Sequence, residues 1–193
     1  MGLRIEKSDQ VVRFEKLNSK FLLKKIEWGA KGKKKIRACQ KIKRSLIDSH
    51  YMKKALDQAA KAAGRGEVPV GCVLVKSGLE LYSCGNMVEE LKNGLAHAEI
   101  LALEQASKDY GRYLNDFTMY VSLEPCCMCA GALINARIGR LVFAAPDPER
   151  GACGSAFDLT GDPGKIHHFP VMGGVMAEEA SKMLKEFFKS RRN

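Results

Sequence analysis

The sequence has no long apolar segment. No run of apolar residues approaches the roughly 20 that a helix needs to cross a bilayer. The first residues, MGLRIEKSDQVVRFEK, alternate charged with apolar side chains and lack the continuous apolar stretch of a secretory signal. We therefore expect a protein that has no membrane association, is not secreted and is cytoplasmic.

A disulfide framework is also missing. The chain has seven cysteines, an odd number, and four of them stand alone. This distribution favours a reduced compartment over a set of disulfide bonds. The other three lie within residues 126–129 and need a separate explanation.

Acidic residues are scarce at the front of the chain. Residues 1–50 contain 15 Lys and Arg but five Asp and Glu, whereas residues 51–193 contain 17 of each kind. The net charge of +10 therefore belongs to the front alone. We expect the remainder of the chain to bind a polyanion only through local patches.

The composition changes near residue 48, which predicts a basic N-terminal extension, residues 1–48, and a domain, residues 49–193. Within the extension, residues 10–28 carry apolar side chains at roughly helical spacing, which fits either an amphipathic helix or a disordered arm. The extension is open to several interpretations: an RNA-binding arm, an upstream segment without a role, a transit peptide or a weak nuclear address. Its lysine excess and five acidic residues disfavour the transit peptide.

From Ser49 onward, helical and strand patterns alternate. We expect helices over 49–63, 96–107, 125–136 and 178–188, and strands over 70–75, 79–84, 118–123 and 141–145. Ser49 and Pro125 are predicted to begin their helices. Residues 146–168, rich in Gly, Pro and Asp, predict a long functional loop. This order indicates an α/β domain with helices on both faces of a sheet, which is mixed because its first two strands form a hairpin.

Two short motifs carry the chemistry: HAE at 97–99 and PCCMC at 125–129, each at a predicted helix start. Cys126 and Cys129 are three residues apart, so a helix places both sulfurs on one face, and a helix N-terminus favours their thiolates. With His97 they supply three zinc ligands and leave a fourth position for water. That pattern is typical of a catalytic zinc rather than a structural one.

Glu99 is the predicted catalytic residue. It lies two residues after His97, close enough to take a proton from the zinc-activated water and deliver it to a leaving nitrogen. Each motif alone is weak, because HxE pairs are common on helix surfaces and CxxC pairs also occur in redox dithiols and structural zinc sites. Together, H-x-E and P-C-x-x-C mark the zinc-dependent nucleobase deaminases. Cys127 lies about 100° around the helix from Cys126 and is expected to be a core or spare thiol.

From about Ser49 to Arg192 the sequence resembles the TadA-type tRNA-specific adenosine deaminases of the cytidine deaminase-like superfamily. The matching stretches are EVPVG at 67–71, AHAEI at 96–100, LEPC at 123–126, MCAGA at 128–132, RIGR at 137–140, GACGS at 151–155 and FFKSRR at 187–192. The resemblance implies a three-layer α/β/α cytidine deaminase-like fold with a central mixed five-stranded sheet. It also implies one Zn2+ per subunit and a homodimer that acts on a tRNA anticodon stem-loop.

The resemblance further implies where substrate binds. Asn86 would contact the flipped nucleotide, and Asp147 the nucleotide or the anticodon backbone. Phe188, Arg191 and Arg192 would contact the RNA. Bases splayed out of an anticodon loop suit such recognition, because specific RNA reading targets unstacked bases.

Two departures from the family pattern lie near the expected site. Asn93-Gly94-Leu95 stands where the family has Asp-Pro-Thr, and Pro146 stands where it has a basic residue. The first bears on loop geometry and the second on RNA contacts, and neither touches the zinc ligands.

The leading hypothesis is zinc-dependent hydrolytic deamination of adenosine to inosine at the wobble position of a tRNA anticodon. One alternative is a free-base or nucleoside deaminase of the guanine or cytosine type. Another is a non-catalytic zinc-containing RNA-binding partner. The terminal Phe187-Phe188 and basic cluster favours RNA over a small molecule, and Glu99 favours catalysis, since inactive relatives would be expected to lose it.

Overall fold

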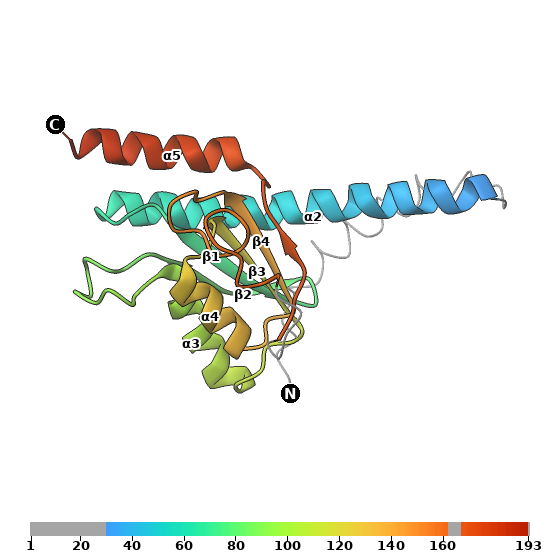
Figure 1. The fold of residues 1–193 in the computed structure, drawn as a ribbon, viewed down its shortest axis with the longest axis horizontal. Coiled ribbons are helices and arrows are strands. Elements are labelled where there is room, and N and C mark those ends of the chain that lie inside the picture. The colour runs from blue at the N-terminus through green and yellow to red at the C-terminus, as the bar shows by residue number, and fades with distance from the viewer. Residues whose placement is uncertain (1–29, 162–166, 193) are drawn as a thin grey trace, which may run out of the picture. The chain divides into compact units, whose positions relative to one another are not determined.

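In a computed structural model of the protein, residues 30–161 and 167–192 are described, and they form four helices and five strands (Figure 1). Within those two ranges, none of the helices combines the length and the apolar composition of a membrane-spanning segment. The chain divides into two compact units, Met1–Arg44 and Ser45–Asn193. The described part of the first unit is helical, as the start of α2 (Ala30–Gly64). The helix or arm predicted over 10–28 lies outside the described residues.

The second unit is built on a five-stranded sheet. Its strands are β1 (Gly71–Lys76), β2 (Leu79–Gly85), β3 (Phe117–Leu123), β4 (Arg140–Ala145) and β5 (Val171–Met172), in the order β2-β1-β3-β4-β5. β1 is antiparallel to both neighbours, whereas β3, β4 and β5 run parallel. Gly78, with φ of 76°, makes the tight turn between β1 and β2. The prediction of a mixed five-stranded sheet is confirmed.

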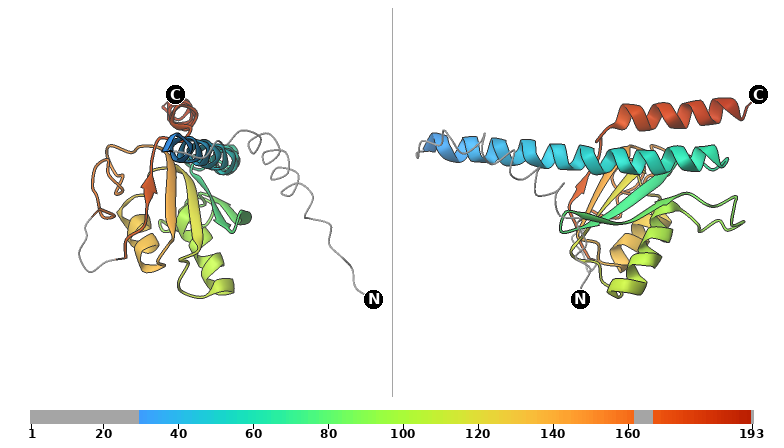
Figure 2. Two further views of the ribbon diagram at one scale, coloured as in Figure 1. Left: turned by 90° about the vertical axis from the view of Figure 1, so that its right-hand side faces the viewer. Right: turned by 180° about the vertical axis from the view of Figure 1, so that it is seen from behind.

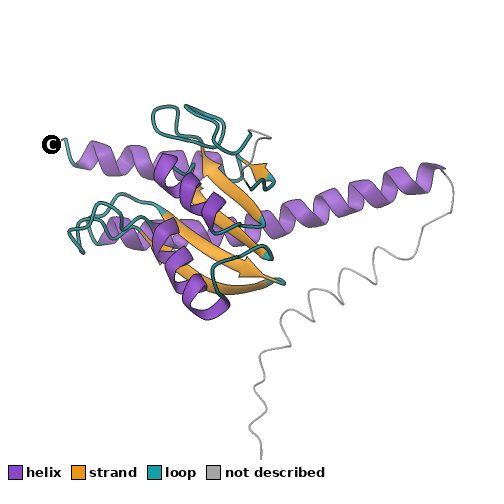
Figure 3. Cartoon of the chain, turned by 60° about the horizontal axis from the view of Figure 1, so that its bottom comes forward, coloured by secondary structure: helices purple, strands orange, loops and turns teal. Residues whose placement is uncertain are grey.

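Helices cover both faces of this sheet (Figures 1 and 2). α3 (Ala98–Tyr110) and α4 (Cys127–Asn135) lie on one face, and residues 45–64 of α2 lie with α5 (Ala177–Ser190) on the other. Successive strand residues point to opposite faces, so Leu74 and Met119 pack with α3 and α4, whereas Val73 and Tyr120 pack with α2 and α5. The predicted three-layer α/β/α arrangement is therefore confirmed, as Figure 3 also shows.

α2 does not begin at Ser49, and the cap predicted there is wrong, because the helix runs through this residue without a break. The residue before it, Asp48, is buried and binds Arg140 of β4, and the hydroxyl of Tyr120 donates to it at 2.9 Å. Because α2 continues upstream of Ser49, Asp48 is part of the helix and its carboxylate is buried against the sheet. The division of the chain at residues 48 and 49 into an extension and a domain stays a prediction.

The other predicted elements occur within three residues of their expected bounds. α3 begins at Ala98 and α4 at Cys127, each two residues later than predicted. This shift places His97 and Cys126 at the N-caps of the two helices rather than inside them. β5 was not identified from the sequence pattern, since two residues are too few to show a period.

Candidate metal centre and active site

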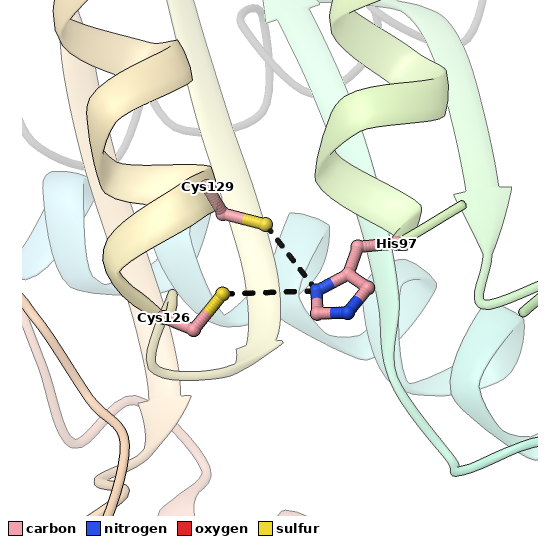
Figure 4. Close-up of side chains that lie close together, drawn as sticks. All are labelled: His97, Cys126 and Cys129. Atoms are coloured by element: carbon pink, nitrogen blue, oxygen red, sulfur yellow. Dashed lines mark hydrogen bonds between the residues drawn. The ribbon is translucent and has the colours of Figure 1, made fainter. Parts of the chain in front are cut away.

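His97, Cys126 and Cys129 converge where α3 and α4 begin (Figure 4). The two N-cap residues, His97 and Cys126, have extended backbone conformations, and neither side chain caps its own helix. Both side chains are thus free to meet Cys129, which lies buried in the first turn of α4. His97 Nδ1 lies 3.8 Å from Cys126 Sγ and 3.5 Å from Cys129 Sγ.

The spacing of the three donor atoms fits a zinc ion. Tetrahedral zinc, with Zn–S bonds of about 2.3 Å and Zn–N bonds of about 2.0 Å, requires N···S separations of about 3.6 Å. The two separations here, 3.8 and 3.5 Å, bracket that value, and all three ligand atoms lie within 4.8 Å of one another. In the described part of the chain, no other group of three or more such side chains is close enough to hold a metal. Three protein ligands leave one tetrahedral position open.

The two sulfurs differ in proton affinity. A hydrogen bond from the Cys129 thiol is the main cause that lowers the pKa of Cys126 to about 3. The same bond, together with burial, raises the pKa of Cys129 well above its usual range. A hydrogen bond to Cys126 also raises the pKa of His97. The sulfur pair therefore holds one proton at neutral pH, which a zinc ion would displace on binding.

Glu99 lies beside this triangle in the first turn of α3 and is 3% exposed. Burial raises the pKa of its carboxyl group. Its Oε2 is the one buried side-chain oxygen or nitrogen of the described residues that lacks a hydrogen-bond partner. Because leaving such an atom unpaired costs about 1–3 kcal/mol, its retention at this position points to a function in proton transfer.

A cavity of about 210 Å³ includes Glu99 and two of the three ligand residues in its wall. His97, Glu99 and Cys126 form one part of the wall, and Asn86 and Asp147 reach it from neighbouring loops. The wall is completed by Val68, Val70, Val88, Leu123, Glu124 and Arg150. Apolar walls with a few convergent polar groups are usual for a site that binds a small organic group. The structure thus brings two predicted nucleotide contacts, Asn86 and Asp147, to the cavity that His97 and Cys126 line.

Glu124 fixes the loop that carries Asp147. Its carboxylate is 2% exposed and accepts four hydrogen bonds. Three come from the backbone N–H groups of Asp147, at 3.1 Å, and of Cys153 and Ser155, at 3.0 Å each. The fourth comes from the hydroxyl of Ser155. Gly151 packs against the same carboxylate, where a Cβ atom would collide with it.

Asp147 lines the cavity and also caps its own loop. Its Oδ1 accepts hydrogen bonds from the N–H groups of Glu149 and Arg150, both at 3.0 Å. One carboxylate oxygen is therefore committed to the loop. The preceding Pro146 is exposed and does not line the cavity.

The other departure from the family pattern, at residues 93–95, leaves a closed turn. Asn93 Oδ1 accepts a hydrogen bond from the N–H of Leu95 at 3.0 Å, and the Asn93 carbonyl accepts one from Ala96. The Leu95 side chain is 60% exposed. The turn therefore gets its hydrogen bonds from Asn93, without a hydroxyl at residue 95.

The three predicted RNA contacts at the end of α5 do not line the cavity. Phe188 is 46% exposed and packs edge-to-face on Phe187. The guanidinium of Arg191 lies over the Phe187 ring and donates to the carbonyl of Gly66, whereas Arg192 is exposed. Figure 1 places this end of α5 beside the C-terminal end of α2. Arg191 thus ties α5 to the segment that follows α2.

The sequence assigned no role to Glu124, which lines the cavity, or to Glu67, which accepts a hydrogen bond from the cavity residue Asn86. Both are almost fully buried, although glutamate is rarely buried in proteins. The available signal was their position in the stretches EVPVG and LEPC, beside residues that line the cavity. Cys127 was expected to be either a core thiol or a spare thiol. It is exposed, so it is not part of the core.

Comparisons with known proteins agree with this geometry. Residues 46–145 match the family model of the cytidine and deoxycytidylate deaminase zinc-binding region. The tRNA-specific adenosine deaminase of Haemophilus influenzae is 45% identical over 151 residues, which are 77% of this chain and 87% of that protein. That of Bacillus subtilis is 41% identical over 146 residues, 75% of this chain and 91% of the relative.

A solved structure gives the same result. It comes from biochemical and structural studies of A-to-I editing by tRNA:A34 deaminases and matches with a TM-score of 0.67 at 40% identity, over 70% of this chain and 99% of that one. The donor set of His97, Cys126 and Cys129 fits the single zinc ion of such a deaminase domain. Both the sequence and the fold therefore match over most of the relatives' length, and the chain belongs to the family of tRNA-specific adenosine deaminases, which are zinc-dependent hydrolases.

Proposed function

We propose that this protein catalyses the hydrolytic deamination of adenosine to inosine at the wobble position of a tRNA anticodon. The observation that carries the proposal is the Glu99 carboxylate, which has a buried, unpartnered oxygen and lines the same cavity as His97 and Cys126, two residues of the His/Cys/Cys triangle. The relatives supply the substrate, because they are tRNA-specific adenosine deaminases and the solved relative belongs to work on A34.

In this mechanism His97, Cys126 and Cys129 hold the zinc ion. When bound, zinc supplies Lewis acidity that activates water for addition to the ring carbon bearing the exocyclic amine. Glu99 accepts a proton from that water and delivers it to the leaving nitrogen, so that ammonia departs. The raised pKa of the Glu99 carboxyl suits a group that must both take up and release a proton.

Substrate contacts are proposed at both ends of the site. Asn86 and Asp147 contact the flipped nucleotide, and their place in the cavity wall supports this role. Phe188 and Arg192 contact the RNA from the end of α5, where both are exposed. Arg191 also contacts RNA in this proposal, while its bond to Gly66 holds α5 in place.

The N-terminal extension is proposed to bind the tRNA outside the anticodon loop. Residues 30–44 contain eight Lys and Arg and no acidic residue, whereas residues 51–193 are neutral overall. A long RNA substrate offers phosphates to such a segment. We further propose a homodimer that acts in the cytoplasm. The cytoplasmic location is supported by the cysteines, all seven of which are free.

The test compares substrates. The purified zinc-loaded protein is incubated with an anticodon stem-loop that carries adenosine at the wobble position and, separately, with free adenosine, guanine and cytosine. We expect inosine in the stem-loop and no ammonia from the free compounds. Ammonia from a free base or nucleoside alone would favour the small-molecule alternative. No turnover of any substrate, with zinc bound, would favour the non-catalytic RNA-binding partner.

A further inference from the structure

We propose that Glu67 is a positioning residue that orients the side-chain amide of Asn86 toward the substrate. Glu67 lies in the connection between α2 and β1, and its exposed fraction is 0%. Burying a carboxylate is costly unless its oxygens are paired, so its partners indicate what it does. The inference rests on the proposed function, since it concerns substrate recognition in the same cavity.

Both oxygens of Glu67 accept hydrogen bonds from the loop that follows β2. Oε2 accepts one from Asn86 Nδ2 at 3.0 Å, and Oε1 accepts one from the backbone N–H of Glu90 at 2.8 Å. Arg65 holds the same loop from the exposed side: its guanidinium donates to the Asn86 carbonyl at 3.2 Å and pairs with Glu90 Oε2 at 3.1 Å. Of these contacts, only the bond to Glu67 engages the Asn86 side chain.

This bond decides which end of the Asn86 amide faces the cavity. Asn86 Nδ2 donates to Glu67 Oε2 at 3.0 Å, so Oδ1, at the other end of the amide, faces away from Glu67. Asn86 is 6% exposed and lines the cavity together with Glu99 and Asp147. Among the described residues, none donates a hydrogen bond to Asn86 Oδ1. That oxygen is therefore available to a hydrogen-bond donor of the nucleoside, a ribose hydroxyl or an N–H group.

A fixed acceptor gives selectivity that a freely turning amide would not. An amide that can rotate offers either its oxygen or its nitrogen to the substrate. An amide held by Glu67 offers its oxygen, so a substrate with an acceptor at that position leaves two acceptors facing each other without a proton between them. Glu67 thus acts on substrate binding through Asn86, without touching the substrate or the zinc ligands.

The variant Glu67→Gln tests the orientation directly. The introduced amide has one acceptor and one donor, but it faces two donors. The backbone N–H of Glu90 cannot turn, so it keeps the amide oxygen, and the introduced nitrogen then faces Asn86. Asn86 satisfies it by turning its own amide, which presents Nδ2 to the cavity in place of Oδ1. In the variant, the substrate group that donates to Asn86 Oδ1 in the wild type meets the donor Nδ2 instead and loses its hydrogen bond. We therefore expect kcat/KM for the stem-loop to fall about 10- to 100-fold, mainly through a higher KM.

Asn86→Asp provides a rescue. In the double variant E67Q/N86D the introduced carboxylate accepts from the introduced amide and offers its second oxygen to the cavity, which restores the acceptor. We expect the double variant to recover at least about tenfold in kcat/KM over E67Q. N86D alone sets two carboxylates against each other and is expected to be worse than the double variant. Glu89→Gln is the matched control, because it makes the same chemical change on an exposed side chain of the same loop and leaves both the Glu90 N–H and the Arg65–Glu90 pair in place.

Two further measurements separate this inference from folding and from the proposed function. Zinc content and melting temperature are expected to be the same in E67Q and E89Q. The NMR signal of the Asn86 side-chain NH2, identified by its loss in N86D, is expected to shift in E67Q and not in E89Q, whichever substrate the enzyme prefers. An unchanged signal in E67Q, or a double variant no better than its two parents, would overturn the role of Glu67. Wild-type protein that forms no inosine would instead overturn the proposed function and leave the NMR result standing.

Discussion

Arg140 of β4 binds the carboxylate of Asp48 in α2 through both terminal nitrogens of its guanidinium, at 2.6 and 2.8 Å. The side chains are 11% and 2% exposed, so the pair is shielded from water. The hydroxyl of Tyr120 donates to the same carboxylate, and burial and this bond raise the pKa of Tyr120. A buried ion pair adds little to the stability of the folded protein. Removing one partner is strongly destabilising, because the other charge is then buried alone.

Asp48→Asn is therefore expected to lower the free energy of unfolding by about 3 kcal/mol, because it leaves the Arg140 charge buried without its partner. Urea unfolding followed by circular dichroism, at fixed zinc saturation, measures the loss. Lys54→Gln is the control, since it breaks the more exposed pair of Lys54 with Glu80 and should cost less than about 1 kcal/mol. Equal losses in the two variants would show that the Asp48 pair does not hold α2 to the sheet.

Glu124→Gln is expected to loosen the loop from Asp147 to Ser155. In the wild type, four N–H and O–H donors share the two carboxylate oxygens of Glu124. In the variant an amide nitrogen replaces one of these oxygens, so at least one of the four donors loses its acceptor. We expect faster proteolytic cleavage within residues 147–161 and a fall of about tenfold or more in kcat/KM. Glu149→Gln, on an exposed residue of the same loop, serves as the control. Cleavage rates that match the wild type would contradict the assignment of Glu124 as the anchor of this loop.

The zinc-free protein is expected to show an unusual thiol at Cys126. A pKa of about 3 leaves Cys126 ionised at every pH above 5, so its alkylation rate by iodoacetamide should be nearly constant between pH 5 and 8. An ordinary peptide thiol, the reference, reacts about tenfold faster for each pH unit over this range. Zinc should protect Cys126 from the reagent. A rate that climbs with pH in parallel with the reference would rule out the thiolate assigned to Cys126.

Removal of residues 1–44 tests the basic extension. This truncation keeps Asp48 and leaves the cavity residues intact. We expect weaker binding of full-length tRNA and a shallower dependence of log affinity on log salt, because fewer phosphates are neutralised. Activity on a short anticodon stem-loop should change less than about twofold. An unchanged salt slope with full-length tRNA would remove the extension from the RNA-binding surface.

The zinc triangle was accessible from the sequence because its chemistry is local. Cys126 and Cys129 are three residues apart, and His97 and Glu99 are two apart, so each pair is fixed by the start of one helix. The proximity of the N-termini of α3 and α4 is the one feature of the triangle that depends on the tertiary fold. It was expected from the family resemblance. The same logic explains why the three-layer fold was predicted, whereas the two-residue β5 was not identified from its own pattern.

The buried carboxylates could not be predicted in this way. Glu67 and Glu124 bind backbone groups and side chains 19 to 31 residues away, and nothing in their neighbours' periodicity marks them as interior. Asp48 pairs with a residue 92 positions away. Ser49 misled for a related reason: a serine caps a helix only if the chain upstream leaves the helix, and here it does not.

Nucleoside analysis of tRNA incubated with the wild-type protein and with Glu99→Gln tests the central claim most directly. We predict inosine at the wobble position with the wild type, and at least about 100-fold slower formation with the variant at equal zinc content, because the proposed mechanism assigns the proton transfer to Glu99. Inosine formed by the variant at the wild-type rate, or none formed by the zinc-loaded wild type, would contradict the account.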